Sequence, residues 1–269
     1  LLGHWLLRCV SVVFNRYHTL EAALRNYRVS GTTIFESPNY TLATSDSLAF
    51  IWACGDDLWN HVLYARVLDF IGGVQQDRIT EPLHGIAGFA LATAQKGSVR
   101  NLAQHVAGVA KAVLKKLSRE HDAVMLSTYL PLRERLKLEL SLGQSPQVWR
   151  TPPLRVVEPD VQARRSLTLD AGQHEGLDRF LRLHLHELIP TCYLEGYASL
   201  KAQVGSLGWP AAPEFIYTAN NFDSDEIFKA WTAEHVERGI RYITGQHGNN
   251  YGTHIWAGAE FWPERAAAD

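Results

Sequence analysis

The sequence has little of what marks several familiar protein classes. Its 3 cysteines are far apart and form no C-x-x-C pair, which argues against a disulfide framework and indicates isolated thiols in a reducing compartment. No apolar run approaches the roughly 20 residues that a membrane helix needs. The 26 lysines and arginines nearly balance the 28 acids, and the net charge of -2 offers no broad basic surface for nucleic acid.

Several catalytic signatures are also missing. The sequence contains no G-x-S-x-G, P-loop, H-E-x-x-H or complete dinucleotide fingerprint, which argues against serine hydrolases, P-loop NTPases, zincins and NAD enzymes. It has a single methionine, Met125, and it begins with Leu-Leu-Gly-His-Trp inside a helical pattern. We therefore expect it to be a piece of a longer gene product.

The apolar spacing predicts an α/β protein. Helical spacing predicts helices over residues 5–27, 48–71, 101–117, 133–142, 172–188 and 223–238. Short buried runs predict strands over residues 121–127, 214–219 and 240–244. The proline-containing segment 149–159 is the expected boundary between a helix-rich N-terminal α/β domain, 1–150, and a second domain, 151–269.

A glycine-rich loop, GQHGNNYG, follows the last predicted strand. Its three glycines, Gly245, Gly248 and Gly252, let backbone N–H groups approach an anion, and its amides add neutral donors. His247 can accept a proton from an attacking hydroxyl or stabilise a leaving phosphate. The alternative is an ordinary polar turn after a strand.

A second cluster, YTANNFDSDEIFKAW, follows the preceding strand. Asp223 and Asp225 form a D-x-D pair, a spacing that can hold a divalent metal on diphosphate oxygens. The alternative is helix capping, with Asp223 and Glu226 close to a capping box. Asn220 and Asn221 lie where the strand ends, so they can contact a ligand or form a turn.

A histidine pair, His184 and His186, is the third candidate. On a helix, residues two apart point to different faces, so the two rings do not hold one metal there. Surface or capping roles are sufficient to account for both histidines.

Five separated stretches, taken together and in this order, resemble a family of transferases encoded in bacterial O-antigen and other surface-polysaccharide clusters. They are LLGHWLLRCVSVVFNRY, TSDSLAFIWACGDDLWN, LGQSPQVW, YTANNFDSDEIFKAW and GQHGNNYGTH. The resemblance implies a Rossmann-like, two-domain scaffold of the glycosyltransferase B kind, with 151–269 as the start of an incomplete donor-binding domain. It also implies a location in the cytoplasm, or at the inner face of the membrane.

The same resemblance implies a nucleotide-activated sugar donor and a glycan or lipid-linked glycan acceptor. We expect no cofactor. We expect His247 to be catalytic, and we expect the donor to contact Gly245, Gln246, Gly248, Asn249, Asn250, Tyr251, Gly252, Asn220, Asn221 and Asp223. We expect the transfer to need no metal. In the alternative hypothesis, Asp223 and Asp225 hold a divalent metal ion. Two positions depart from the family pattern. His4 stands where proline is usual, and Asn249 stands where glycine is common. Asparagine tolerates the left-handed backbone that glycine can adopt at such a position. A non-catalytic sugar- or nucleotide-binding assembly module is the third possibility.

Overall fold

The computed structural model describes residues 1–37, 40–80 and 118–245, and the chain divides into two compact units. We call them the three-stranded unit, formed by Leu1, Lys96–Leu154 and Leu200–Asp269, and the two-stranded unit, formed by Leu2–Gln95 and Arg155–Ser199. Both combine helices with parallel strands, which confirms the α/β class. The division into domains 1–150 and 151–269 stays a prediction.

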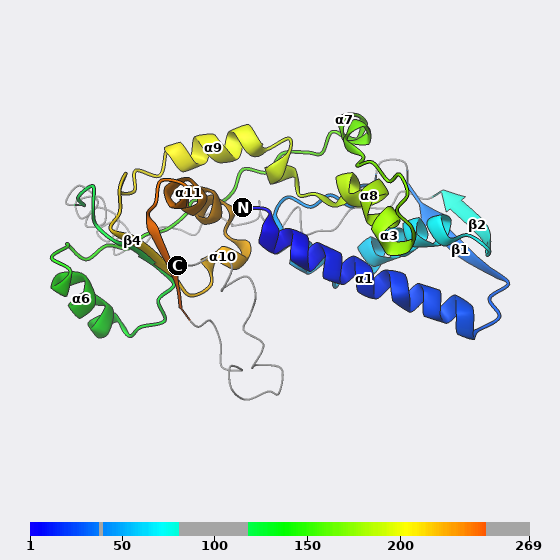
Figure 1. The fold of residues 1–269 in the computed structure, drawn as a ribbon, viewed down its shortest axis with the longest axis horizontal. Coiled ribbons are helices and arrows are strands. Elements are labelled where there is room, and N and C mark those ends of the chain that lie inside the picture. Colours follow the sequence, from blue (N-terminus) through cyan, green and yellow to red (C-terminus); the bar gives the residue numbers. More distant parts are fainter. Residues whose placement is uncertain (38–39, 81–117, 246–269) are drawn as a thin grey trace, which may run out of the picture. The chain divides into compact units, whose positions relative to one another are not determined.

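The three-stranded unit is built on a parallel sheet in the order β3-β4-β5. Figure 1 labels its central strand, β4. Its described elements are β3 (Val124–Leu126), α6 (Leu132–Ser141), β4 (Phe215–Thr218), α10 (Asn221–Ser224), α11 (Glu226–Val236) and β5 (Arg241–Thr244). Helix α9 (Tyr197–Gly205) contains the boundary between the units. The strands predicted at 121–127, 214–219 and 240–244 are present as β3, β4 and β5, the first shortened to Val124–Leu126, and the helix predicted at 133–142 is present as α6.

Apolar side chains from the sheet and from helices α9 and α11 form the core of this unit. Ile216 of the central strand is fully buried, and it packs with Leu200 of α9 and Phe228 of α11. Trp209 and Trp231 add an edge-to-face contact with ring centroids 4.9 Å apart. Helices cover the faces of a parallel sheet, so its strands are buried and their sequences are mainly apolar, as the sequence of β4 is.

The two-stranded unit pairs a small parallel sheet with long helices. Its described elements are α1 (Gly3–Asn26), β1 (Gly31–Glu36), α2 (Ser47–Ala53), α3 (Asp57–Ile71), β2 (Gln75–Thr80), α7 (Val161–Arg164), the 3-10 turn Arg165–Leu167, α8 (Gly176–Leu188) and the 3-10 turn Thr191–Tyr193. Helix α1 runs beside α3 and α8 (Figure 1). Its buried residues, Trp5, Cys9, Val13 and Tyr17, repeat every four positions, as the predicted amphipathic helix requires.

The helix predicted over 48–71 is interrupted. Helix α2 ends at Ala53, and α3 starts again after Asp56, whose carboxylate accepts a hydrogen bond from the Trp59 N–H at 2.7 Å. An acid in this position caps the free N–H groups of a new helix, and this local gain favours the break. Gly72, with φ of 72°, ends α3 as predicted.

Strands β1 and β2 were not predicted from the sequence. Their sequences are GTTIFE and QQDRIT, and of these twelve positions Ile34 alone is buried. Ile34 packs on Ala65 and Leu68 of α3, so one side chain anchors the strand pair. A strand with so little apolar periodicity gives no signal that distinguishes it from a loop.

Among the helices of the described ranges, none has both the length and the apolar character needed to cross a membrane. The three cysteines are free thiols, and Cys9 and Cys192 are buried.

Candidate functional site

The carboxyl ends of the three parallel strands meet at one edge of the sheet, which we call the strand-end edge. Leu126 of β3 is opposite Thr218 of β4, and Thr218 is opposite Thr244 of β5. Ligands of open parallel sheets bind outside the carboxyl ends of the strands. The register therefore brings together three chain segments that are distant in the sequence.

Thr218 organises the central segment of the strand-end edge. Its hydroxyl donates to Asn221 Oδ1 at 3.0 Å and accepts from the Asn221 N–H at 3.1 Å, and its carbonyl accepts from the Gly245 N–H at 2.8 Å. These bonds fix the start of α10 and the start of the glycine-rich loop against the same residue. A methyl group on Gly245 would collide with the phenol of Tyr217, so the absence of a side chain permits this close approach.

The segment after β3 has an unusual backbone. Ser127 has φ of 46° and Tyr129 has φ of 53°, both in the left-handed region that residues with side chains seldom adopt. The Tyr129 hydroxyl accepts a hydrogen bond from Asn220 Nδ2 at 2.6 Å, which ties this segment to the end of β4. Backbone strain of this kind gathers at functional sites, where surrounding contacts maintain it.

Asp225 is held by three hydrogen bonds from protein groups. Its Oδ1 accepts from the Phe228 N–H at 3.0 Å, and its Oδ2 accepts from the Thr151 hydroxyl at 2.7 Å and from Asn221 Nδ2 at 2.9 Å. Asp225 is thus the N-cap of α11, whereas the sequence suggested Asp223 for that role. Asp223 lies two positions earlier, inside α10, because the chain completes a separate helical turn before α11 begins.

Replacing Asp225 by alanine is expected to lower the free energy of unfolding by about 2–3 kcal/mol, because a helix cap and two further hydrogen bonds are lost. Urea unfolding measures the loss, with Asp223→Ala as the matched change, expected to cost less than half as much. The loss should be equal in EDTA and in magnesium, because the partners of Asp225 are protein groups. A loss seen only with magnesium would instead favour Asp225 as a metal ligand.

The structure brings Asn220, Asn221 and Gly245 to the strand-end edge, and Asp223 follows in α10. The other predicted residues, Gln246, His247, Gly248, Asn249, Asn250, Tyr251 and Gly252, lie outside the described residues. So does the helix predicted over 101–117. Across the described ranges, no group of three or more His, Cys, Asp or Glu side chains could hold a metal ion.

A model of one protein family, described as the LIC12162 family transferase, matches residues 1–269. The chain belongs to the LIC12162 family of transferases. No curated protein and no solved structure matches the chain. The transferase class expected from the sequence agrees with the description of the LIC12162 family, which does not specify a donor or an acceptor.

The two-stranded unit of this LIC12162 family member holds charged residues that the sequence did not single out. Arg164, 3% exposed, donates from Nε and Nη2 to the carboxylate of Glu195 at 2.6 and 2.7 Å. Its Nη1 donates to the carbonyls of His186 and Ile189 at 2.9 and 2.7 Å. The guanidinium therefore joins α7 to the end of α8 and to the turn that follows.

A second charged group links α3 to α8. Arg66 Nε donates to Glu187 Oε2 at 3.0 Å, and Glu187 Oε1 is 2.9 Å from His184 Nδ1. Burial would raise the pKa of Glu187, but the hydrogen bond from His184 and the Arg66 guanidinium outweigh it and lower the pKa to about 2. Glu187 is therefore a fixed anion at neutral pH.

His184 and His186 have different surroundings, as their spacing predicted. His184 contacts Glu187, whereas His186 is buried, and burial lowers its pKa, so the ring is neutral at pH 7. The three-residue spacing of His184 and Glu187 was visible in the sequence. Arg66 and Arg164 had no such signal, because their acidic partners are 121 and 31 residues away along the chain.

Proposed function

We propose that this member of the LIC12162 family transfers a sugar, or a related group, from a nucleotide-activated donor to a glycan or lipid-linked glycan acceptor in the biosynthesis of surface polysaccharide such as O-antigen. The family description gives the transferase class. The donor and the acceptor are our proposal, and they rest on the chemistry of the strand-end edge and on the resemblance of the five sequence stretches.

The single observation that carries the proposal is the register of β4 and β5. Thr218 pairs with Thr244, and the Gly245 N–H donates to the Thr218 carbonyl. The first residue of the glycine-rich loop is thus bonded to Thr218, which precedes Asn220 and Asn221 by two and three residues. A nucleotide diphosphate needs backbone N–H groups and neutral donors at such a strand end.

In the proposed site, the donor phosphates are held by Gly245, Gln246, Gly248, Asn249, Asn250, Tyr251 and Gly252. Asn220, Asn221 and Asp223 line the neighbouring strand end. The acceptor hydroxyl attacks the anomeric carbon while the bond from that carbon to the nucleotide oxygen breaks. His247 takes the hydroxyl proton as general base, or stabilises the charge of the departing nucleotide, which is the main electrostatic requirement of such a transfer.

The scaffold that we propose is Rossmann-like and of the glycosyltransferase B kind. The support is the β4–α11–β5 unit, two neighbouring parallel strands joined through a helix. Nucleotide sugars are cytoplasmic metabolites, so we propose that the reaction takes place in the cytoplasm, at the inner face of the membrane where the acceptor is lipid-linked.

Nucleotide binding tests the proposal. We expect a nucleoside diphosphate or a nucleotide sugar to raise the melting temperature without magnesium. At one hundred times Kd the stabilisation is about 2.7 kcal/mol, which corresponds to about 5 °C or more. The screen covers uridine, guanosine, cytidine and thymidine nucleotides.

Asn220→Ala should weaken this binding about tenfold, because one hydrogen bond to the ligand is lost. Within the described residues Asn220 Oδ1 has no hydrogen-bond donor, so it can accept from a ribose or sugar hydroxyl. Asn26→Ala, at an exposed position in the two-stranded unit, is the matched control and should leave the affinity unchanged. A folded protein that binds none of these nucleotides would contradict the proposal.

A further inference from the structure

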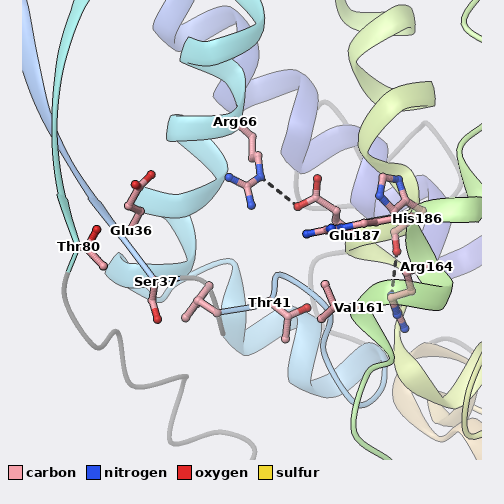
Figure 2. A pocket seen from close by; sticks show the side chains of 11 residues that line it. Glu36, Ser37, Thr41, Arg66, Thr80, Val161, Arg164, His186 and Glu187 are labelled. Atoms are coloured by element: carbon pink, nitrogen blue, oxygen red, sulfur yellow. Dashed lines mark hydrogen bonds and ion pairs between the residues drawn. The ribbon is translucent and has the colours of Figure 1, made fainter.

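The two-stranded unit contains a cavity of about 550 Å³ between the end of β1, helix α3, the α7 turn and helix α8 (Figure 2). All of its lining residues belong to this one unit. The volume is in the range of small-molecule sites, about 300–1,000 Å³. The strand-end edge does not contribute to it, so the cavity is a separate feature.

Arg66 presents a pre-oriented guanidinium to this cavity. Its Nε is bonded to Glu187, and Glu187 is held in turn by His184. Figure 2 shows Arg66 reaching from α3 toward Glu187 on α8. In the described part of the chain the two terminal nitrogens of Arg66 have no hydrogen-bond acceptor, so both can donate to a ligand.

The charged residues that line the cavity carry one positive charge in excess. Three are arginines, Arg66, Arg164 and Arg165, and two are glutamates, Glu36 and Glu187. Arg66 pairs with Glu187, Arg164 pairs with Glu195, and Glu36 shares Arg78 with Asp69. Arg165 also lines the cavity, and it is exposed and has no acidic partner among the residues that the structure describes. A ligand that carries one anionic group would complete this charge balance.

Four of the six uncharged lining residues, Ser37, Tyr40, Thr41 and Thr80, carry a hydroxyl group. Ser37, Thr41 and Thr80 line the cavity, and Val161 is its single aliphatic residue among those described (Figure 2). Hydroxyls can both donate and accept, which suits a ligand that is itself rich in hydroxyls. An apolar ligand would leave these hydroxyls desolvated without partners.

We propose that this cavity binds a small, hydroxyl-rich molecule with one anionic group, a monosaccharide that carries a carboxylate or a phosphate. The anion would contact the terminal nitrogens of Arg66 together with Arg165, and the sugar hydroxyls would contact Ser37, Thr41 and Thr80. This site is independent of the nucleotide site proposed at the strand-end edge.

Isothermal titration of the whole chain tests the proposal with four probes: glucuronate, glucose 1-phosphate, glucose and inorganic phosphate. At least one of the two anionic sugars should bind, and the stronger one identifies the anionic group. Glucose should bind at least ten times more weakly, because the charge-assisted hydrogen bonds are missing. Inorganic phosphate should also bind at least ten times more weakly than that sugar, because it lacks the hydroxyls.

The variant Arg66→Gln should weaken binding of the anionic sugar about tenfold, and Arg165→Gln should weaken it about threefold. Arg179→Gln, at an exposed position on α8 outside the cavity, is the matched control and should change nothing. If Arg66→Gln fails to fold, Arg165→Gln still decides the matter, because Arg165 is exposed and unpaired within the described ranges.

Three results would overturn the inference: no anionic sugar binds, glucose or inorganic phosphate binds as tightly, or Arg165→Gln has no effect. The nucleotide screen is scored separately with Asn220→Ala. Failure at one site therefore leaves the other intact and identifiable.

Discussion

Replacing His247 by alanine is expected to lower the rate of transfer by about two to four orders of magnitude. The proposed role is acceptance of the proton from the attacking hydroxyl, and alanine cannot perform it. Initial rates with a saturating donor, measured by release of the nucleotide, give the effect. Donor affinity should change far less, since the loop glycines and amides supply most of the contacts to the phosphates.

A pH profile separates the two roles proposed for His247. A general base must be deprotonated, so kcat/KM should rise as the pH passes through about 6.5 and then level off. A purely electrostatic role requires the protonated ring, and the rate would then fall over the same interval. His174→Ala, at an exposed position in the two-stranded unit, is the control. Activity of His247→Ala within a few-fold of the parent would remove His247 from the mechanism.

Replacing Arg164 by alanine should lower the free energy of unfolding of the two-stranded unit by about 3–5 kcal/mol. The change leaves the carboxylate of Glu195 without its cation, and it leaves the carbonyls of His186 and Ile189 without the donor that Arg164 supplies. Urea unfolding followed by tryptophan fluorescence measures the loss. Arg182→Ala is the matched control, because its pair with Asp178 is exposed, and such pairs contribute less than about 1 kcal/mol.

The loss should depend on pH in a defined direction. Burial raises the pKa of Glu195, but the Arg164 hydrogen bond and charge outweigh it, so the pKa lies below its usual value of 4.5. A lowered pKa means that the pair stabilises the fold above about pH 4.5 and loses this contribution as the pH falls further. The difference between Arg164→Ala and the parent should therefore shrink below pH 4.5. An equal loss at pH 7 and at pH 3 would contradict the assigned pairing.

The sequence predicted those elements whose burial follows a simple period. The apolar run that ends in Leu126 and the strand around Ile216 were found because both are buried in the sheet. Strand β1 was missed because Ile34 is its single buried residue. Local hydrogen bonding decided the helix starts: the sequence favoured Asp223 as the cap, but Asp223 lies inside the turn of α10 and Asp225 caps α11.

Some parts of the candidate sites could likewise be predicted from the sequence, and other parts could not. The strand-end edge was predictable, because parallel strands must place the residues that follow them at a common edge. The contribution of Tyr129 was not, because its bond to Asn220 spans 91 residues and depends on a left-handed backbone at a residue with a large side chain. The cavity with Arg66 could not be inferred either. Its wall comes from residues 36–80 and 161–187, and in the sequence these two segments are separated by residues 96–154 of the three-stranded unit.

The pairing of β3 with β4 has a consequence for synthesis of the chain on the ribosome. Val124 pairs with Ile216, which is translated about ninety residues later, a delay of about 5–20 s at ordinary rates of translation. During that interval the apolar segment Val124–Leu126 has no partner strand from β4, and unpaired apolar strands promote aggregation. A nascent chain halted before residue 215 should therefore need chaperone protection, and that need should end once β4 has emerged.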